Sequence, residues 1–191
     1  TPAIADDDSS TTETTLGGFA GNENLITQSE NIEGNFGPHD GTKSGVIANS
    51  AVAPDGTNTA DKIYAKQNGT NIGVFKNFGS TLDAGVYSFS VYLKAGEFTT
   101  ALFNSGGGDA WGQIWFNLSN GTVGSTNGGV WSNGAMTDEG DGWWRCSGTR
   151  SLSGTSDYLY VLQANSDSTT EATANGTDGL YVWGLQLNTH S

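Results

Sequence analysis

Residues 111–118, with the sequence WGQIWFNL, place aromatic rings and amides at alternate positions. In a β-strand, side chains two residues apart share a face, so this segment would have an apolar face made of Ile114, Phe116 and Leu118. The opposite face would carry two tryptophans interleaved with two amides: Trp111, Gln113, Trp115 and Asn117. Rings stack on flat apolar surfaces and amides exchange hydrogen bonds with hydroxyl groups, so this face could bind a ligand that offers both.

Two interpretations of this face stay open. Amides are costly in an apolar core unless they are hydrogen-bonded, which favours a ligand platform over a packed wall. A tryptophan could instead cover a sheet edge or the core, and in an oligomer the whole face could be a subunit interface. A second group of candidate ligand-binding residues lies farther along the chain: Trp131, Trp143 and Arg145, with Tyr158 and Tyr160 as further candidates.

The groups that catalysis needs are scarce in this sequence. Its two histidines are His39 and His190, and its one cysteine, Cys146, lies in the segment WWRCSGT, which predicts a buried strand position. A nucleophile activated by a histidine base, or a zinc site, needs more of these residues close together. Acidic residues fall in turn-like segments 137–142 and 164–171, where solvated carboxylates are more usual than the paired carboxylates of glycoside hydrolysis. We therefore expect a protein that is not an enzyme and requires no cofactor.

The charge balance excludes two classes of partner. The 191 residues include 20 Asp and Glu against 7 Lys and Arg, which gives a formal net charge of −13 and an isoelectric point near 4.1. Such a surface repels the phosphates of nucleic acids and anionic lipids. The sequence also has no apolar run long enough to span a bilayer. We expect no nucleic acid partner and no membrane insertion.

The chain divides into two parts by composition. Residues 1–23 are acidic and rich in Ser and Thr, which predicts a flexible arm or linker, with docking onto a partner subunit as the alternative. Residues 24–191 repeat short alternating apolar runs separated by Gly, Asn, Asp and Ser, without a helical stripe, which predicts an all-β sandwich or barrel. The expected strands lie near residues 24–27, 45–52, 60–65, 71–78, 85–94, 98–104, 111–118, 129–132, 142–149, 157–164 and 179–187.

Three strand features can be predicted in more detail. The clearest strand, 85–94, has an apolar face made of Phe89, Val91 and Leu93. This face should share one core with the apolar face of 111–118. Trp143 and Trp144 are adjacent and should therefore point to opposite faces. Gly184 is expected to form a bulge that shifts the alternation of the last strand.

Five segments, taken in order, resemble a known type of domain. They are NLITQSENIEGNFG (24–37), VAPDGTNTADKIY (52–64), AGVYSFSVYLKAGE (84–97), DGWWRCSGT (141–149) and DGLYVWGLQLN (178–188). In this order they resemble a β-sandwich domain of bacteriophage virion proteins, especially tail-fibre and head-associated proteins. That domain is similar to the jelly-roll carbohydrate-binding modules attached to polysaccharide-degrading enzymes. The resemblance implies an antiparallel, jelly-roll-like β-sandwich whose first and last segments lie close together.

The resemblance also implies a metal site. Jelly-roll binding modules often carry a structural calcium ion near such termini, and its oxygen ligands here could come from Glu30, Glu33, Asp40 and Asp178. The last segment departs from the pattern, because Trp183 stands where many calcium-bearing relatives have an acidic residue. This departure argues against the calcium.

The residue chemistry and the resemblance together predict a non-catalytic, virion-associated carbohydrate-binding or adhesion module that contacts cell-surface glycans. Its expected partners are cell-surface or polymeric carbohydrate and other virion proteins, and it could assemble as a homotrimer. Its expected location is the surface of a phage particle, or otherwise outside the cell. One alternative is a structural virion protein, a head decoration or fibre segment, whose aromatic faces serve assembly. The other is a carbohydrate-binding module of a polysaccharide-degrading enzyme.

Overall fold

The computed structural model describes residues 24–26, 29–79, 82–106, 111–152 and 157–189. Within these ranges the chain forms one short helix, α1 (Ile32–Asn35), and a series of β-strands. The strands are β1 (Gly37–Pro38), β2 (Ser44–Ala51), β3 (Ala60–Ala65), β4 (Gly69–Thr70), β5 (Ile72–Gly79), β6 (Gly85–Lys94), β7 (Thr100–Gly106), β8 (Gly112–Asn117), β9 (Thr122–Asn127), β10 (Trp131–Asp138), β11 (Trp143–Leu152), β12 (Asp157–Ala164), β13 (Glu171–Ala172) and β14 (Gly179–Thr189). The predicted arm, 1–23, lies outside the described residues.

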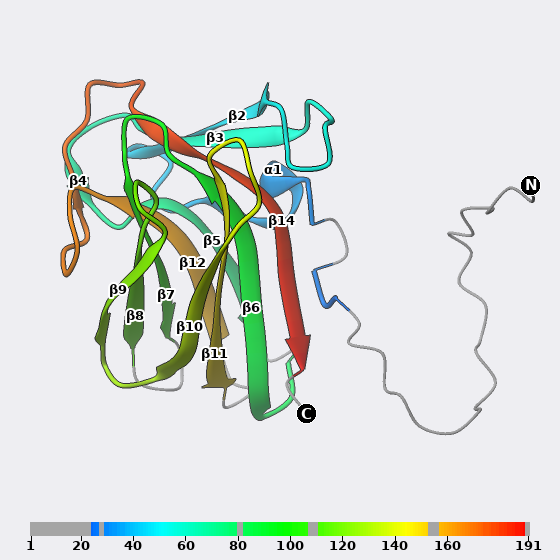
Figure 1. The fold of residues 1–191 in the computed structure, drawn as a ribbon. Helices are drawn as coiled ribbons and strands as arrows, with labels where there is room; N and C mark the ends of the chain where they lie inside the picture. Colours follow the sequence, from blue (N-terminus) through cyan, green and yellow to red (C-terminus); the bar gives the residue numbers. More distant parts are fainter. Residues whose placement is uncertain (1–23, 27–28, 80–81, 107–110, 153–156, 190–191) are drawn as a thin grey trace, which may run out of the picture.

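Two six-stranded sheets form a sandwich (Figure 1). Sheet A has the strand order β1-β5-β12-β7-β8-β9, and sheet B has the order β10-β11-β6-β14-β3-β2. The pairings within both sheets are antiparallel. The short strands β4 and β13 pair separately. The prediction of an all-β, antiparallel, jelly-roll-like sandwich is confirmed. In the described part of the chain, no helix is long and apolar enough to cross a membrane.

The core lies between the two sheets because their apolar side chains alternate onto the inner faces. The ring of Phe103 on β7 connects the layers: its centroid lies 4.7 Å from that of Phe89 on β6 and 4.6 Å from that of Phe116 on β8. The six residues predicted to share one core are all buried in the same cluster: Phe89, Val91, Leu93, Ile114, Phe116 and Leu118.

The first described residues close the sandwich against its last strand, as the resemblance implied. The Asn24 side chain accepts a hydrogen bond from the backbone N–H of Leu187 and donates one to the carbonyl of Leu185. The predicted bulge in β14 is also confirmed. Gly184 has a φ of +62°, and the pairing of β14 with β6 shifts register between Trp183 and Gln186.

Strand β11 places its two adjacent tryptophans on opposite faces, as predicted. Trp144 packs against the central core and donates its indole N–H to the carbonyl of Leu118, whereas Trp143 donates to the carbonyl of Val52. Cys146, also on β11, is fully buried, and burial raises the pKa of its thiol well above the ordinary value. Cys146 is therefore a packing residue, as expected.

Several elements differ from the sequence-based prediction: α1, β1, β4, β9 and β13 were not expected, and β10 extends to Asp138, beyond the expected run 129–132. Strand β9, with the sequence TVGSTN, was not expected, because its single large apolar residue, Val123, is exposed. The expected strand near 24–27 is absent from the residues described there, since Leu25 bonds the carbonyl of Leu187 without forming a ladder. Both segments lie at sheet margins, where apolar alternation is weak.

Candidate functional site

A straight row of side chains crosses the outer face of sheet A. In the strand register, Phe75 on β5 pairs with Tyr160 on β12, and Tyr160 pairs with Asn104 on β7. Asn104 pairs with Gln113 on β8, which pairs with Asn127 on β9. Four of these residues each have a chain neighbour in the central core, so alternation turns their side chains outward; the neighbours are Val74, Val161, Phe103 and Ile114. We call these five residues the sheet A row.

Aromatic rings cover one end of the row. The rings of Phe75 and Tyr160 are stacked, with centroids 5.5 Å apart and planes 19° apart. Tyr158 continues the stack at 6.4 Å from Tyr160, and Trp111 lies 6.4 Å from Tyr158 at an angle of 21°. Trp111 is 53% exposed. Phe75, Tyr160, Tyr158 and Trp111, here called the aromatic strip, present near-parallel rings beside the row.

A glycine makes room for the most exposed ring of the strip. Gly106 on β7 pairs with Tyr158, and a Cβ atom at position 106 would lie 2.2 Å from the indole of Trp111. The indole can rest on the β7 backbone only because position 106 has no side chain.

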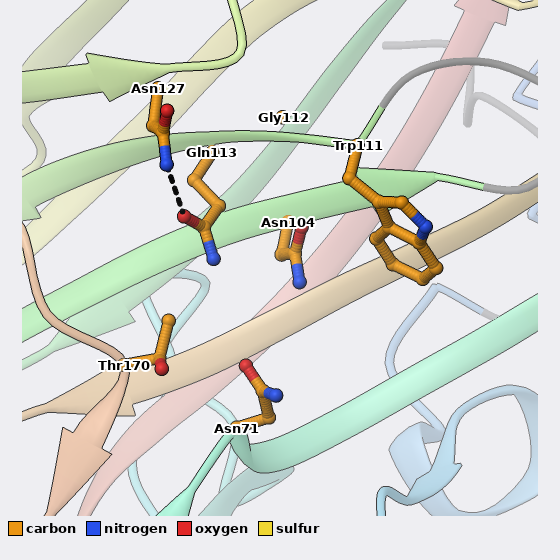
Figure 2. Close-up of a pocket in the computed structure, with 7 residues that line it drawn as sticks. All are labelled: Asn71, Asn104, Trp111, Gly112, Gln113, Asn127 and Thr170. Carbon is orange, nitrogen blue, oxygen red and sulfur yellow. Dashed lines mark hydrogen bonds between the residues drawn. The ribbon is translucent and has the colours of Figure 1, made fainter.

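The other end of the row is made of amides around a cavity of about 350 Å³ (Figure 2). The cavity is lined by Asn71, Asn104, Trp111, Gly112, Gln113, Asn127 and Thr170, and none of these residues carries a charge. Figure 2 shows the side chains of Asn71, Thr170, Asn104 and Gln113 gathered around one space, with Trp111 at its rim. The amide of Asn127 donates to Oε1 of Gln113 over 3.4 Å, which orients the Gln113 side chain.

Asn104 brings a buried polar atom to the wall of the cavity. Its side chain is 6% exposed, and its Oδ1 atom is buried without a hydrogen-bond partner among the described residues. Leaving a buried acceptor unpaired costs about 1–3 kcal/mol. Such a group in a cavity wall is expected where a ligand supplies the missing donor.

His39 supports the aromatic strip from the edge of sheet A. Its ring meets those of Phe75 and Tyr160 edge-on, at centroid distances of 5.6 and 5.3 Å, and its Nδ1 lies 2.9 Å from the carbonyl oxygen of Asn71. Burial, and then the neighbouring Tyr158, raise the pKa of the Tyr160 hydroxyl. Tyr160 therefore stays neutral at physiological pH.

The structure separates the four residues predicted to share one front face. Trp111 and Gln113 belong to the site, but Trp115 is 2% exposed and donates its indole N–H to the carbonyl of Thr169 over 2.8 Å. The segment around Thr169 covers the Trp115 ring, so the expectation that this ring stacks on a ligand is corrected. Asn117 lies farther along β8, where its side chain accepts from the backbone N–H of Ser119 and stabilises a turn.

The second group of predicted residues lies elsewhere. Trp131 is 6% exposed and donates its indole N–H to the carbonyl of Gly112, so it closes the core. Trp143 is 2% exposed beneath the segment around Val52. Both rings are buried walls and not ligand platforms, which corrects the expectation. Arg145 is on β11 of sheet B, so it cannot extend a platform on sheet A.

Several site residues were not predicted from the sequence: Asn71, Phe75, Asn104, Asn127 and Thr170. Asn104 left a usable signal, because it is a polar residue that directly follows the apolar run ALF (101–103) of its strand. Asn71 and Thr170 left none, since they lie in Asn- and Thr-rich loops like many others in this chain.

The expected calcium ligands do not gather into one site. Among the residues that the structure describes, no three His, Cys, Asp or Glu side chains are grouped so that they could hold a metal ion. Asp40 instead pairs with Lys43 over 3.1 Å and accepts from the hydroxyl of Thr42.

No protein-family model matches the chain, and no curated protein matches it. Similar solved structures were found, and two of them contain CBM22-1 domains. One is the CBM22-1 xylan-binding domain of Paenibacillus barcinonensis Xyn10C, with 15% sequence identity, a TM-score of 0.44, and coverage of 81% of this chain and 85% of that one. The other holds the CBM22-1 and GH10 modules of Clostridium thermocellum endo-1,4-beta-D-xylanase 10B with xylohexaose, at 13% identity, a TM-score of 0.47, and coverage of 88% and 28%. This chain thus spans less than a third of the xylanase structure.

Proposed function

We propose that this chain is a non-catalytic carbohydrate-binding module, and that it binds a neutral glycan on the sheet A row and the aromatic strip. The observation that carries the proposal is that the aromatic strip, which ends in the exposed ring of Trp111, borders an uncharged cavity in which Oδ1 of Asn104 is buried without a partner among the described residues. A sugar presents apolar C–H faces and a rim of hydroxyl groups, and these two kinds of surface match the rings and the amides.

The geometry supports a division of roles within the site. The ring of Trp111 is open to solvent and can stack on the apolar face of a sugar ring. Gln113 and Asn104 can then bind hydroxyl groups, because each amide offers both a donor and an acceptor. The uncharged lining, together with a net charge of −13, favours a neutral sugar at this face.

The biological setting can be tested through assembly. The resemblance of five segments to virion β-sandwich domains supports an adhesion module on a phage particle, and the resemblance to enzyme-attached modules supports the alternative. Phage fibre parts are usually trimers, whereas enzyme-attached modules are usually monomers. Light scattering on the full chain distinguishes the two: a trimer favours the virion setting and a monomer favours the enzyme-attached one.

The binding proposal is tested with two site variants, Trp111→Ala and Gln113→Ala. A glycan array selects the best neutral polysaccharide, and isothermal titration calorimetry then measures its affinity. Each variant should weaken binding at least tenfold, which corresponds to about 1.4 kcal/mol. The matched control is Tyr64→Ala, because the Tyr64 ring also lies against a glycine, Gly45, but on sheet B. Unchanged affinity in both site variants, or no neutral glycan bound by the wild type, would refute the proposal.

A further inference from the structure

The outer face of sheet B carries a second polar hollow, on the opposite side of the sandwich from the sheet A row. It has a volume of about 290 Å³ and lies over β10, β11, β6 and β14. Its lining side chains include Ser88, Ser90, Arg145, Ser147, Thr149 and Asn188. We call it the Arg145 hollow, and no acidic residue lines it.

The strand register places aromatic rings beside this hollow. Arg145 on β11 pairs with Tyr92 on β6, and Tyr92 pairs with Trp183 on β14. The two rings are half-buried and meet edge-on, with centroids 5.3 Å apart. Two residues along β6, Ser90 pairs with Gln186, whose side-chain Oε1 accepts a hydrogen bond from Arg145. Like the sheet A row, this face combines rings with hydrogen-bonding groups.

The guanidinium group of Arg145 is fixed in position but not neutralised. Its Nη2 donates to Oγ of Ser90 over 3.1 Å and to Oε1 of Gln186 over 3.3 Å. Both acceptors are uncharged, and Nε and Nη1 make no hydrogen bond to any residue that the structure describes. A fixed guanidinium with free N–H groups matches the geometry of a carboxylate.

Arg145 keeps its charge without a carboxylate partner among the described residues, although the chain is acidic. Acidic residues outnumber basic ones by 20 to 7; Lys43 and Lys62 each pair with a carboxylate, whereas Lys66 and Lys76 bind backbone carbonyls. Arg145 makes no ion pair with a described residue, although the hollow is open to solvent. The structure thus keeps one positive charge available in a hollow lined by hydroxyl groups and amides.

We infer that the Arg145 hollow is a second binding site, which takes a sugar residue that carries a carboxylate, such as a uronic acid. Arg145 would bind the carboxylate, while the serine and amide groups around it bind the hydroxyls. The net charge of −13 repels densely charged polyanions, so the glycan is one that carries isolated acidic residues on a neutral chain. This inference does not depend on the function proposed for sheet A.

The test compares a trisaccharide containing one uronic acid with its uncharged methyl ester. NMR titration of the wild-type chain should show that the acid binds at least tenfold more tightly than the ester, because only the acid forms charge-assisted hydrogen bonds. Arg145→Gln should reduce the affinity for the acid to that for the ester. Lys66→Gln removes the same charge elsewhere on the surface, where Nζ of Lys66 donates to the carbonyl of Gly41, and should leave the affinity unchanged.

Other outcomes would overturn the inference. Equal binding of acid and ester by the wild type would do so without relying on any variant. So would full binding by Arg145→Gln, an equal loss in Lys66→Gln, or displacement of the trisaccharide by sulfate or phosphate at the same concentration. Trp111→Ala separates the two faces: the acid should still bind this variant, and loss of binding would place the acid at the sheet A row instead.

Discussion

Asn104 and Trp115 lie on neighbouring strands with their side chains on the same outer face. The role of each depends on the groups that cover its side chain and on the hydrogen bonds that these groups offer. The ring of Trp115 is covered by the segment around Thr169, which accepts its indole N–H. Asn104 is just as buried, but what covers it leaves its amide oxygen without a donor. Trp115 is therefore part of the packed structure, and Asn104 is available to a ligand.

This difference gives a prediction for Asn104→Leu. A leucine of similar size removes the unpaired acceptor, so the free energy of unfolding should stay the same or rise by about 1 kcal/mol. Affinity for the neutral glycan should fall at least tenfold, because the floor of the cavity can no longer exchange hydrogen bonds with a hydroxyl group. Urea denaturation and calorimetry measure the two quantities. A variant that loses stability as well as affinity would show that Asn104 has a structural role.

At the scale of elements, the alternation of apolar and polar residues predicted most strands, but not which strands are neighbours in a sheet. The runs at 60–65, 85–94 and 157–164 match β3, β6 and β12 in both bounds, because buried faces force a two-residue period. Strand β9 escaped prediction because it lies at a sheet edge with exposed, small polar residues.

The site could be predicted only in part for a related reason. Trp111, Gln113, Tyr158 and Tyr160 were recognised as candidates within their own strands. The sequence does not state that β12 and β8 both flank β7, nor that β11 belongs to the other sheet. Sheet order depends on long-range packing, so the row that joins Phe75 to Asn127 could not be seen along the chain.

The close approach of β7 to the aromatic strip can be tested with Gly106→Ala. The new methyl group would overlap the Trp111 indole, and that ring, being largely exposed, should move without unfolding the sheet. We expect altered tryptophan fluorescence and a glycan affinity at least fivefold weaker. Gly37→Ala is the control, because a Cβ at this position on β1 of the same sheet has nothing within 4 Å. Wild-type affinity in Gly106→Ala would mean that the position of the indole is not critical.

At the scale of the whole molecule, the two outer faces of the sandwich carry similar kinds of uncharged side chain but differ in charge. Each combines aromatic rings with amides or hydroxyls, and the sheet B hollow adds the cationic side chain of Arg145. The chain as a whole is strongly acidic, so acid pH changes many groups at once. A pH experiment on this protein is informative only when one carboxylate is compared with its own neutral variant.

Glu97 allows such a comparison, because it joins three parts of the fold. Its Oε2 accepts from Nζ of Lys62 on β3 over 2.8 Å and from the backbone N–H of Gly179, at the start of β14, over 3.0 Å. The Lys62 hydrogen bond, followed by that of Gly179, lowers the pKa of Glu97 below its ordinary value of 4.5. Folding therefore favours the ionised form, so the stabilisation is present above the unfolded pKa and is lost as pH falls through the folded one.

The prediction concerns the difference in unfolding free energy between wild type and Glu97→Gln. At pH 7 the variant should be less stable by only about 0.5 kcal/mol, because the Glu97 side chain is 50% exposed and water screens the pair. The difference should shrink as the pH is lowered past the pKa of Glu97, since the wild-type carboxyl then becomes neutral too. Urea denaturation at a series of pH values measures it, with Glu171→Gln, an exposed acid on β13, as the control. Subtracting the two curves removes the repulsion shared by all the other acids, so a difference that stayed constant with pH would mean that Glu97 stabilises the fold by packing and not by its charge.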